Sequence, residues 1–193
     1  MNISDEEFQE KLAAHRERRE QLIAKLYSVF AAVTREGGVS WSEAEYLDGP
    51  PRKMADRLKV RAKDKEKSWH DLIDDPNFNP IRGFSFLDSI GFRYYMVPTM
   101  IRELKGREER ALDFYLDKRH KQPQGDIINR PGYRLQLSTS FPFIFLVWDD
   151  ESVIGNYWAC FTADQLACVD EFEAVMKESD HWGFNPYVGG QIP

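Results

Sequence analysis

The sequence predicts a mainly helical α+β fold: one domain over residues 1–180, with a small antiparallel β element in its C-terminal half, and an irregular tail over 181–193. Three observations lead to this prediction. Capping boxes mark helix starts, apolar residues recur at helical spacing, and a strand-like run, FPFIFLVW, occurs late in the chain. A length of 193 residues favours a single domain that buries its core without disulfide or metal staples.

The first predicted helix begins at Ser4, whose hydroxyl can cap it while Glu7 reaches back to complete a capping box. Apolar residues then follow a 3.6-residue period, but arginines interrupt the early part of the stripe. We therefore expect the second half of this helix to be better buried than the first. Glycines at 37–38 are expected to end it, because glycine adopts the left-handed cap conformation readily.

Two further helices are predicted before residue 76. Ser40 and Glu43 form a second capping box, and the helix it opens must stop at the GPP sequence of 49–51. Residues 52–73 show the clearest amphipathic pattern, with apolar side chains within an arc of about 100°. We expect a third helix over this range, closed by the Asp-Pro pair at 75–76.

The middle of the chain gives mixed signals. FSFLD at 84–88 is compatible with one helical turn, whereas FRYYMV at 92–97 is rich in residues typical of strands. Pro98 suits the first turn of a helix that would continue to Leu104.

The C-terminal half contains the predicted β element and the last helix. Residues 141–148 and the segment around 157–159 are expected to pair as antiparallel strands across a hairpin turn. Thr162 and Gln165 form a third capping box, which opens an amphipathic helix to about Glu178.

The composition excludes several classes of protein. A net charge of −6 and a pI of about 5.3 argue against general nucleic-acid binding, which needs clustered basic residues. No secretory signal is present, and the longest apolar run is too short to span a bilayer, so we expect a cytoplasmic protein without a membrane span. Cys160 and Cys168 are expected to be reduced, with Cys168 inside a helix.

Known catalytic motifs are absent, so we assign no catalytic residue, cofactor or metal ligand from the sequence. Histidines and cysteines lack zinc-ligand spacing. Glu43, Glu45 and Asp48 lie on one short helix but point in different directions, which disfavours a shared metal ion. Glu43 is better explained as a helix cap.

The stretch FSFLDSIGFRYYMVP at 84–98 places charges among aromatic residues and has two interpretations. In the structural one, which we favour, Asp88 accepts backbone amides in a turn that Gly91 permits, and Arg93 pairs with Asp88. In the functional one, Asp88, Arg93 and Tyr95 converge in a pocket lined by aromatic residues.

The motifs SWSEAEYLD, FLDSIGFRYYMVPTM and FTADQ, with a Trp between the first two, resemble a family of uncharacterised bacterial proteins defined as a domain of unknown function. The resemblance spans roughly residues 39–177. It carries no activity, but it implies a set of positions important for folding or for a site: Glu43, Asp48, Trp69, Asp88, Gly91, Arg93, Tyr95 and Pro98.

Two hypotheses for function follow. The first is a soluble, non-enzymatic protein that binds a protein partner, such as an antidote or other accessory protein, since aromatic residues and arginine anchor interfaces. The alternative is an enzyme that uses a pocket of carboxylates and arginine, with a divalent metal as an option. The sequence defines neither the oligomeric state nor the role of the basic run at 52–67, which is either a binding face or solvated.

Overall fold

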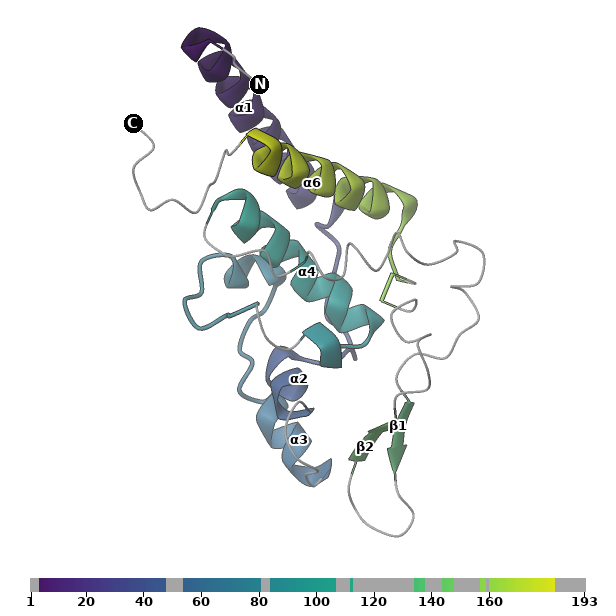
Figure 1. Cartoon of the computed structure of the whole chain (residues 1–193). Coiled ribbons are helices and arrows are strands. Elements are labelled where there is room, and N and C mark those ends of the chain that lie inside the picture. The colour runs from purple at the N-terminus through teal and green to yellow at the C-terminus, as the bar shows by residue number, and fades with distance from the viewer. Residues whose placement is uncertain are drawn as a thin grey trace. The chain divides into compact units, whose positions relative to one another are not determined.

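The computed structural model describes residues 4–47, 54–80, 84–106, 112, 134–137, 144–147, 157–158 and 160–182 (Figure 1). The chain divides into two compact units. Unit 1 comprises Met1–Ala32, Met100–Glu109 and Thr162–Pro193, and unit 2 comprises Val33–Thr99 and Arg110–Phe161. Whether the chain is one domain over residues 1–180 stays a prediction, and the tail beyond residue 182 lies outside the described residues.

Unit 1 is built on two long helices, α1 (Asp5–Val29) and α6 (Ala163–Trp182). Both predicted N-terminal cap residues are confirmed, but Glu7 does not complete a capping box with Ser4 among the described residues. Its carboxylate instead lies 3.6 Å from Lys11 Nζ. The Glu7 amide donates to Ser4 Oγ at 3.2 Å. At the start of α6, the Thr162 amide donates to Gln165 Oε1 at 3.1 Å and the Gln165 amide to Thr162 Oγ1 at 3.3 Å, which completes a capping box.

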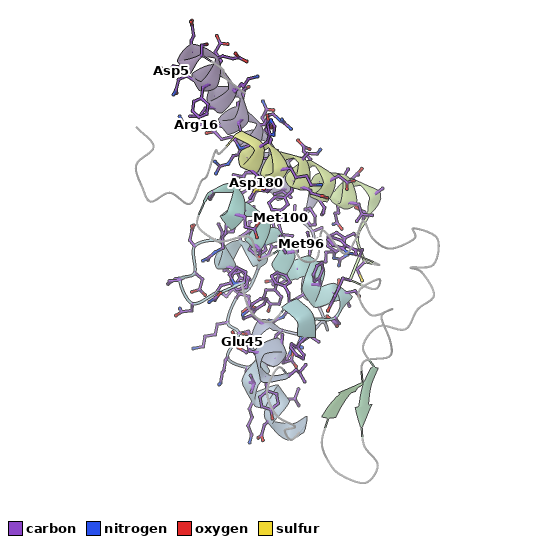
Figure 2. All side chains as sticks on the ribbon, viewed as in Figure 1. Asp5, Arg16, Glu45, Met96, Met100 and Asp180 are labelled. Atoms are coloured by element: carbon purple, nitrogen blue, oxygen red, sulfur yellow. The ribbon has the colours of Figure 1, made fainter. Side chains whose placement is uncertain are left out.

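The two helices pack antiparallel, because early residues of α1 meet late residues of α6 (Figure 1). His15 Nε2 lies 2.8 Å from Ser179 Oγ, and Lys25 Nζ lies 2.6 Å from Glu171 Oε2. The first turns of α1, around Asp5, therefore project past the end of α6 (Figure 2). As predicted, the second half of α1 is the better buried, with Leu22 and others fully enclosed.

His15 is 1% exposed, and its burial lowers its pKa below the ordinary value. Glu178 opposes that shift, whereas Arg19 and Arg18 add to it. As the pH falls below about 6.5, His15 binds a proton in the unfolded chain but stays neutral in the folded protein. Protonation therefore favours the unfolded chain, and the free energy of unfolding falls until the pH reaches the lower pKa of the folded state. We expect urea denaturation to show a lower free energy of unfolding at pH 5.5 than at pH 7.5.

This pH dependence should be weaker in His15→Gln. The matched control is His181→Gln, at the exposed end of α6, which should keep the wild-type dependence. An unchanged dependence in His15→Gln would show that other groups cause it.

Helix α1 ends earlier than predicted, at Val29 rather than at the glycines of 37–38. Gly38 has a different role, in unit 2. A Cβ at this position would lie 2.8 Å from Ile90 Cγ2, so the glycine permits close contact with the start of helix α4 (Ser89–Leu104).

Unit 2 contains α2 (Trp41–Leu47), α3 (Met54–Arg61), the 3-10 turns η1 (Trp69–Leu72) and η2 (Phe84–Phe86), and the first part of α4 (Ser89–Leu104). The second predicted helix is thus confirmed. Its described part ends at Leu47, and the GPP sequence lies outside the described residues.

The third predicted helix, over 52–73, is wrong in its extent. Helix α3 ends at Arg61, and Leu58, expected on the buried arc, is 69% exposed. The chain after α3 alternates: Asp64 and Glu66 are largely buried, whereas the lysines beside them are exposed. A helix cannot direct every second residue inward, so hydrogen bonds of these two carboxylates outweigh the amphipathic pattern.

The strand-like segment at 92–97 is helical and lies within α4. The four consecutive residues 94–97 are all at most 3% exposed, so this part of the helix is buried on every side. Strand propensity is weak compared with such burial. Pro98 stands inside the helix instead of in its first turn. The predicted helical turn at 84–88 corresponds to η2.

The predicted α+β class is wrong, because the part of the chain that carries the core is helical. Every buried hydrophobic residue that the structure describes lies in a helix, a turn or a loop. Among the described residues, strand β1 (Arg134–Leu137) pairs antiparallel with β2 (Ile144–Val147) alone, with Leu135 opposite Leu146. The expected partner of 141–148 is a turn at Tyr157 and Trp158, whose rings pack on Phe92 at 4.6 and 5.2 Å.

Both cysteines are free. Cys168 is buried within α6, as expected, and Cys160 is half-buried. None of the helices that the structure describes has the length and hydrophobicity needed to cross a membrane.

Candidate functional site

A pocket of about 620 Å³ opens in unit 2, beside α2 and the segment that follows α3. Aromatic side chains, five carboxylates and two lysines surround it. The lining residues are Trp41, Ser42, Glu45, Lys63, Asp64, Lys65, Glu66, Asp71, Leu72, Asp75, Asn77, Phe78 and Tyr95.

Three buried rings form one side of the pocket. Trp41 packs edge-on against Phe78 at 4.9 Å and lies 5.2 Å from Tyr95, while Phe78 stacks on Tyr95 at 5.9 Å. Such offset and edge-to-face contacts are favourable arrangements for aromatic pairs. All three rings are more than nine-tenths buried, so this wall is fixed by packing.

The Tyr95 hydroxyl organises the polar side of the same wall. It accepts hydrogen bonds from Arg35 Nη1 at 2.8 Å and from the Trp41 amide at 2.9 Å, and it donates to Glu66 Oε1 at 2.9 Å. Arg35 also pairs directly with Glu66. Burial and the nearby Glu66 carboxylate raise the pKa of Tyr95 well above its ordinary value, so the phenol stays protonated and keeps donating.

Asp64 joins this wall to the start of α2. Its carboxylate accepts hydrogen bonds from the Ser42 amide, at 3.2 and 3.3 Å, and from Ser42 Oγ at 2.6 Å. Arg35 Nη1 lies 3.7 Å from Asp64 Oδ2. Lys63 and Lys65, on either side of Asp64, are exposed at the pocket.

Glu45, Asp71 and Asp75 complete the lining. Glu45 is exposed on α2 (Figure 2). Asp71 Oδ2 accepts the amides of Lys67 and Ser68, at 2.8 and 3.1 Å, and these hydrogen bonds lower its pKa, which keeps it charged. Asp75 Oδ1 accepts the Asn77 amide at 2.8 Å.

Glu43, one of the predicted site residues, lies beside the pocket wall and caps the start of α2 from a buried position. It is 1% exposed, and its Oε2 accepts the Ser40 amide at 2.8 Å. The Glu43 amide lies 3.4 Å from Ser40 Oγ, which confirms the second capping box. Arg61 Nη1 contacts the same Oε2 at 2.8 Å and also donates to Gly38 O at 2.9 Å.

Asp88 caps α4. Its Oδ1 accepts the Gly91 amide at 2.8 Å, the usual bond of an N-cap residue, and the Val39 amide at 3.0 Å. Gly91 lies inside the helix instead of in a turn. A Cβ there would approach Val39 O to 2.4 Å, so only glycine allows this contact.

The structure does not bring Asp88, Arg93 and Tyr95 together. Arg93 Nη1 donates to Cys160 O at 2.5 Å, and no ion pair with Asp88 is found among the described residues. Arg93 and Tyr95 are two positions apart on α4, so they point to nearly opposite sides. Of the three, only Tyr95 lines the pocket.

Trp69 is fully buried in η1 and stacks on the His70 ring at 3.7 Å. The nearby residues Asp71 and Leu72 line the pocket, but Trp69 itself does not. Asp48 lies outside the described residues.

Four residues that build the pocket wall with Tyr95 were not predicted from the sequence: Arg35, Trp41, Asp64 and Glu66. Trp41 directly follows the cap residue Ser40, and that position was the one local indication of its importance. The carboxylates stand in a run of alternating charge that resembles an ordinary solvated surface.

No group of three or more histidine, cysteine, aspartate or glutamate side chains is placed to hold a metal ion within the described ranges. The pocket offers carboxylate acceptors beside buried aromatic rings. These are groups that bind cationic and amphipathic ligands.

The fold and the pocket define a helical protein with a carboxylate- and aromatic-lined cleft. The family described as "Family of unknown function (DUF6714)" matches residues 18–117, just over half of the chain. The chain belongs to this family, and every residue that lines the pocket lies within the matched range. Comparisons with curated proteins and with solved structures found no match.

Proposed function

We propose that this protein is a non-enzymatic accessory protein of the cytoplasm, which binds a protein partner through the pocket of unit 2. The observation that carries the proposal is the preformed wall of the pocket. Buried rings and the Arg35–Tyr95–Glu66 hydrogen bonds hold the wall in place, so little ordering is needed when a ligand binds.

The same contacts favour binding over catalysis. A general acid or base needs a pKa near the working pH, whereas the pKa of Tyr95 is raised away from it. The wall carboxylates of Asp64 and Glu66 already accept hydrogen bonds from Ser42 and Tyr95. Asp88, the carboxylate of the alternative enzyme hypothesis, is engaged with two backbone amides and does not line the pocket.

The test is affinity capture of the tagged protein from lysate of its own cells, with two charge-reversal variants compared by mass spectrometry. Glu45→Lys changes the exposed rim of the pocket, and Glu10→Lys makes the same change at an exposed position of α1. We expect a protein retained by the wild type and by Glu10→Lys to be lost from Glu45→Lys. Equal capture by all three proteins, or none by any, would contradict the proposal.

A further inference from the structure

We propose that the pocket binds a basic segment of its partner, with a lysine or arginine side chain between the carboxylates and a peptide carbonyl on Trp41 Nε1. The inference rests on the proposed function and specifies the chemistry of the partner.

The charges of the pocket favour a cation. Its lining has five carboxylates against two lysines, and the single positive charge of Arg35 lies against Asp64 and Glu66 from inside the wall. With Arg35 included, the carboxylates outnumber the basic side chains by five to three. Hydrogen bonds between a guanidinium or ammonium group and carboxylates are among the stronger ones in proteins.

The shape and the apolar part of the lining favour a long side chain over a bare cation. Rings of Trp41, Phe78 and Tyr95 and the side chain of Leu72 line the same space as the carboxylates. Lysine and arginine place their methylene stems on apolar surface and their charged ends on polar groups. A metal ion or a small amine would leave this apolar surface unused.

Trp41 supplies an independent observation. Its side chain is 6% exposed, and its indole Nε1 has no hydrogen-bond acceptor among the described residues. A buried donor without an acceptor destabilises the folded protein. Trp41 lines the pocket, and a shift of its ring that brings Nε1 to the pocket surface would let a ligand carbonyl relieve this cost. A peptide offers that carbonyl together with a cationic side chain.

An anionic ligand is the opposing possibility, since Lys63, Lys65 and the indole N–H are all donors. It would have to approach Glu45, Asp71 and Asp75, and like charges repel at these distances. Inorganic pyrophosphate is therefore included in the test as the anionic probe.

The experiment measures fluorescence anisotropy of labelled peptides with the full-length protein. The probe is Gly-Arg-Gly-Arg-Gly, and the matched peptides carry citrulline or glutamate in place of arginine. Citrulline keeps the shape of the side chain and removes its charge. We expect the arginine peptide to bind about tenfold more tightly than the citrulline peptide, with binding weakened by salt and no binding of the glutamate peptide.

Three variants locate the site. Glu45→Gln removes one exposed charge and is expected to weaken binding of the arginine peptide about fivefold. Glu10→Gln, the matched change on α1, should leave binding unchanged. Trp41→Phe keeps an aromatic ring but removes the indole N–H donor. It should lower the affinity for the arginine and citrulline peptides by the same factor, since both peptides present a backbone carbonyl.

Equal binding of the arginine and citrulline peptides, equal effects of Glu45→Gln and Glu10→Gln, or displacement of the peptide by pyrophosphate would each overturn the inference. The capture experiment separates this failure from failure of the proposed function. If a partner is captured by the wild type and lost from Glu45→Lys, but the arginine peptide does not bind, the proposed function stands. The inference that the pocket binds a basic segment of the partner is then refuted.

Discussion

Replacing Tyr95 with phenylalanine is expected to lower the free energy of unfolding by about 2–3 kcal/mol, although the aromatic ring is kept. The hydroxyl joins Arg35, Glu66 and the Trp41 amide, and all three lie at buried or half-buried positions. Without it, the Trp41 amide loses its acceptor and the Glu66 carboxylate loses a donor. Urea denaturation followed by circular dichroism should show a lower midpoint with an unchanged slope.

Tyr94→Phe is the matched control for this prediction. Tyr94 is the neighbouring residue on α4 and is 3% exposed, but its hydroxyl makes no hydrogen bond among the described residues. The same chemical change should therefore lower stability by less than about 1 kcal/mol. If the two variants are equally stable, the Tyr95 hydroxyl does not hold the pocket wall together.

The helix starts could be predicted from the sequence because a capping box is a local interaction. Ser40 and Glu43, and likewise Thr162 and Gln165, lie three residues apart, so their hydrogen bonds need no distant part of the chain. Glu43 was correctly interpreted as a cap for this reason. Its second partner, Arg61, lies 18 residues away and was not foreseen.

The helix boundaries could not be predicted because they depend on contacts between residues far apart in the sequence. The segment 92–97 is rich in strand-forming residues, yet Asp88 starts a helix there through its bond to the Gly91 amide. After α3, Asp64 and Glu66 leave the helical path to reach Ser42 and Tyr95, which lie 22 and 29 residues away. Long-range hydrogen bonds of this kind override local propensity.

The site was located only in part for the same reason. Tyr95 was chosen because of its place in an aromatic stretch, but its partner Arg35 is separated from it by 60 positions. Asp88 and Arg93 were chosen with it because they are near in sequence. Arg93 and Tyr95 would share a face of a strand, but on a helix residues two apart point to different sides, so the two side chains are separated.

Replacing Glu43 with alanine is expected to have the largest effect on stability, a loss of about 3 kcal/mol. The substitution removes the cap of the Ser40 amide and leaves the half-buried Arg61 guanidinium without its carboxylate. Glu43→Gln, which keeps an acceptor for Ser40, should lose about half as much. Removing Arg61 as well should add less than its single effect, because the two side chains act as a pair.

Glu45→Ala, two residues along the same helix, is the control for Glu43→Ala and separates stability from binding. Glu45 is exposed, so the change should alter the free energy of unfolding by no more than about 0.5 kcal/mol. Urea denaturation of Glu43→Ala, Glu43→Gln and Glu45→Ala at one pH provides the comparison. Equal stability of the two alanine variants would show that the buried pair of Glu43 and Arg61 does not stabilise unit 2. We expect Glu43→Ala to be much less stable than Glu45→Ala, because the Glu43 carboxylate holds α2 in place whereas the Glu45 carboxylate is exposed at the pocket rim.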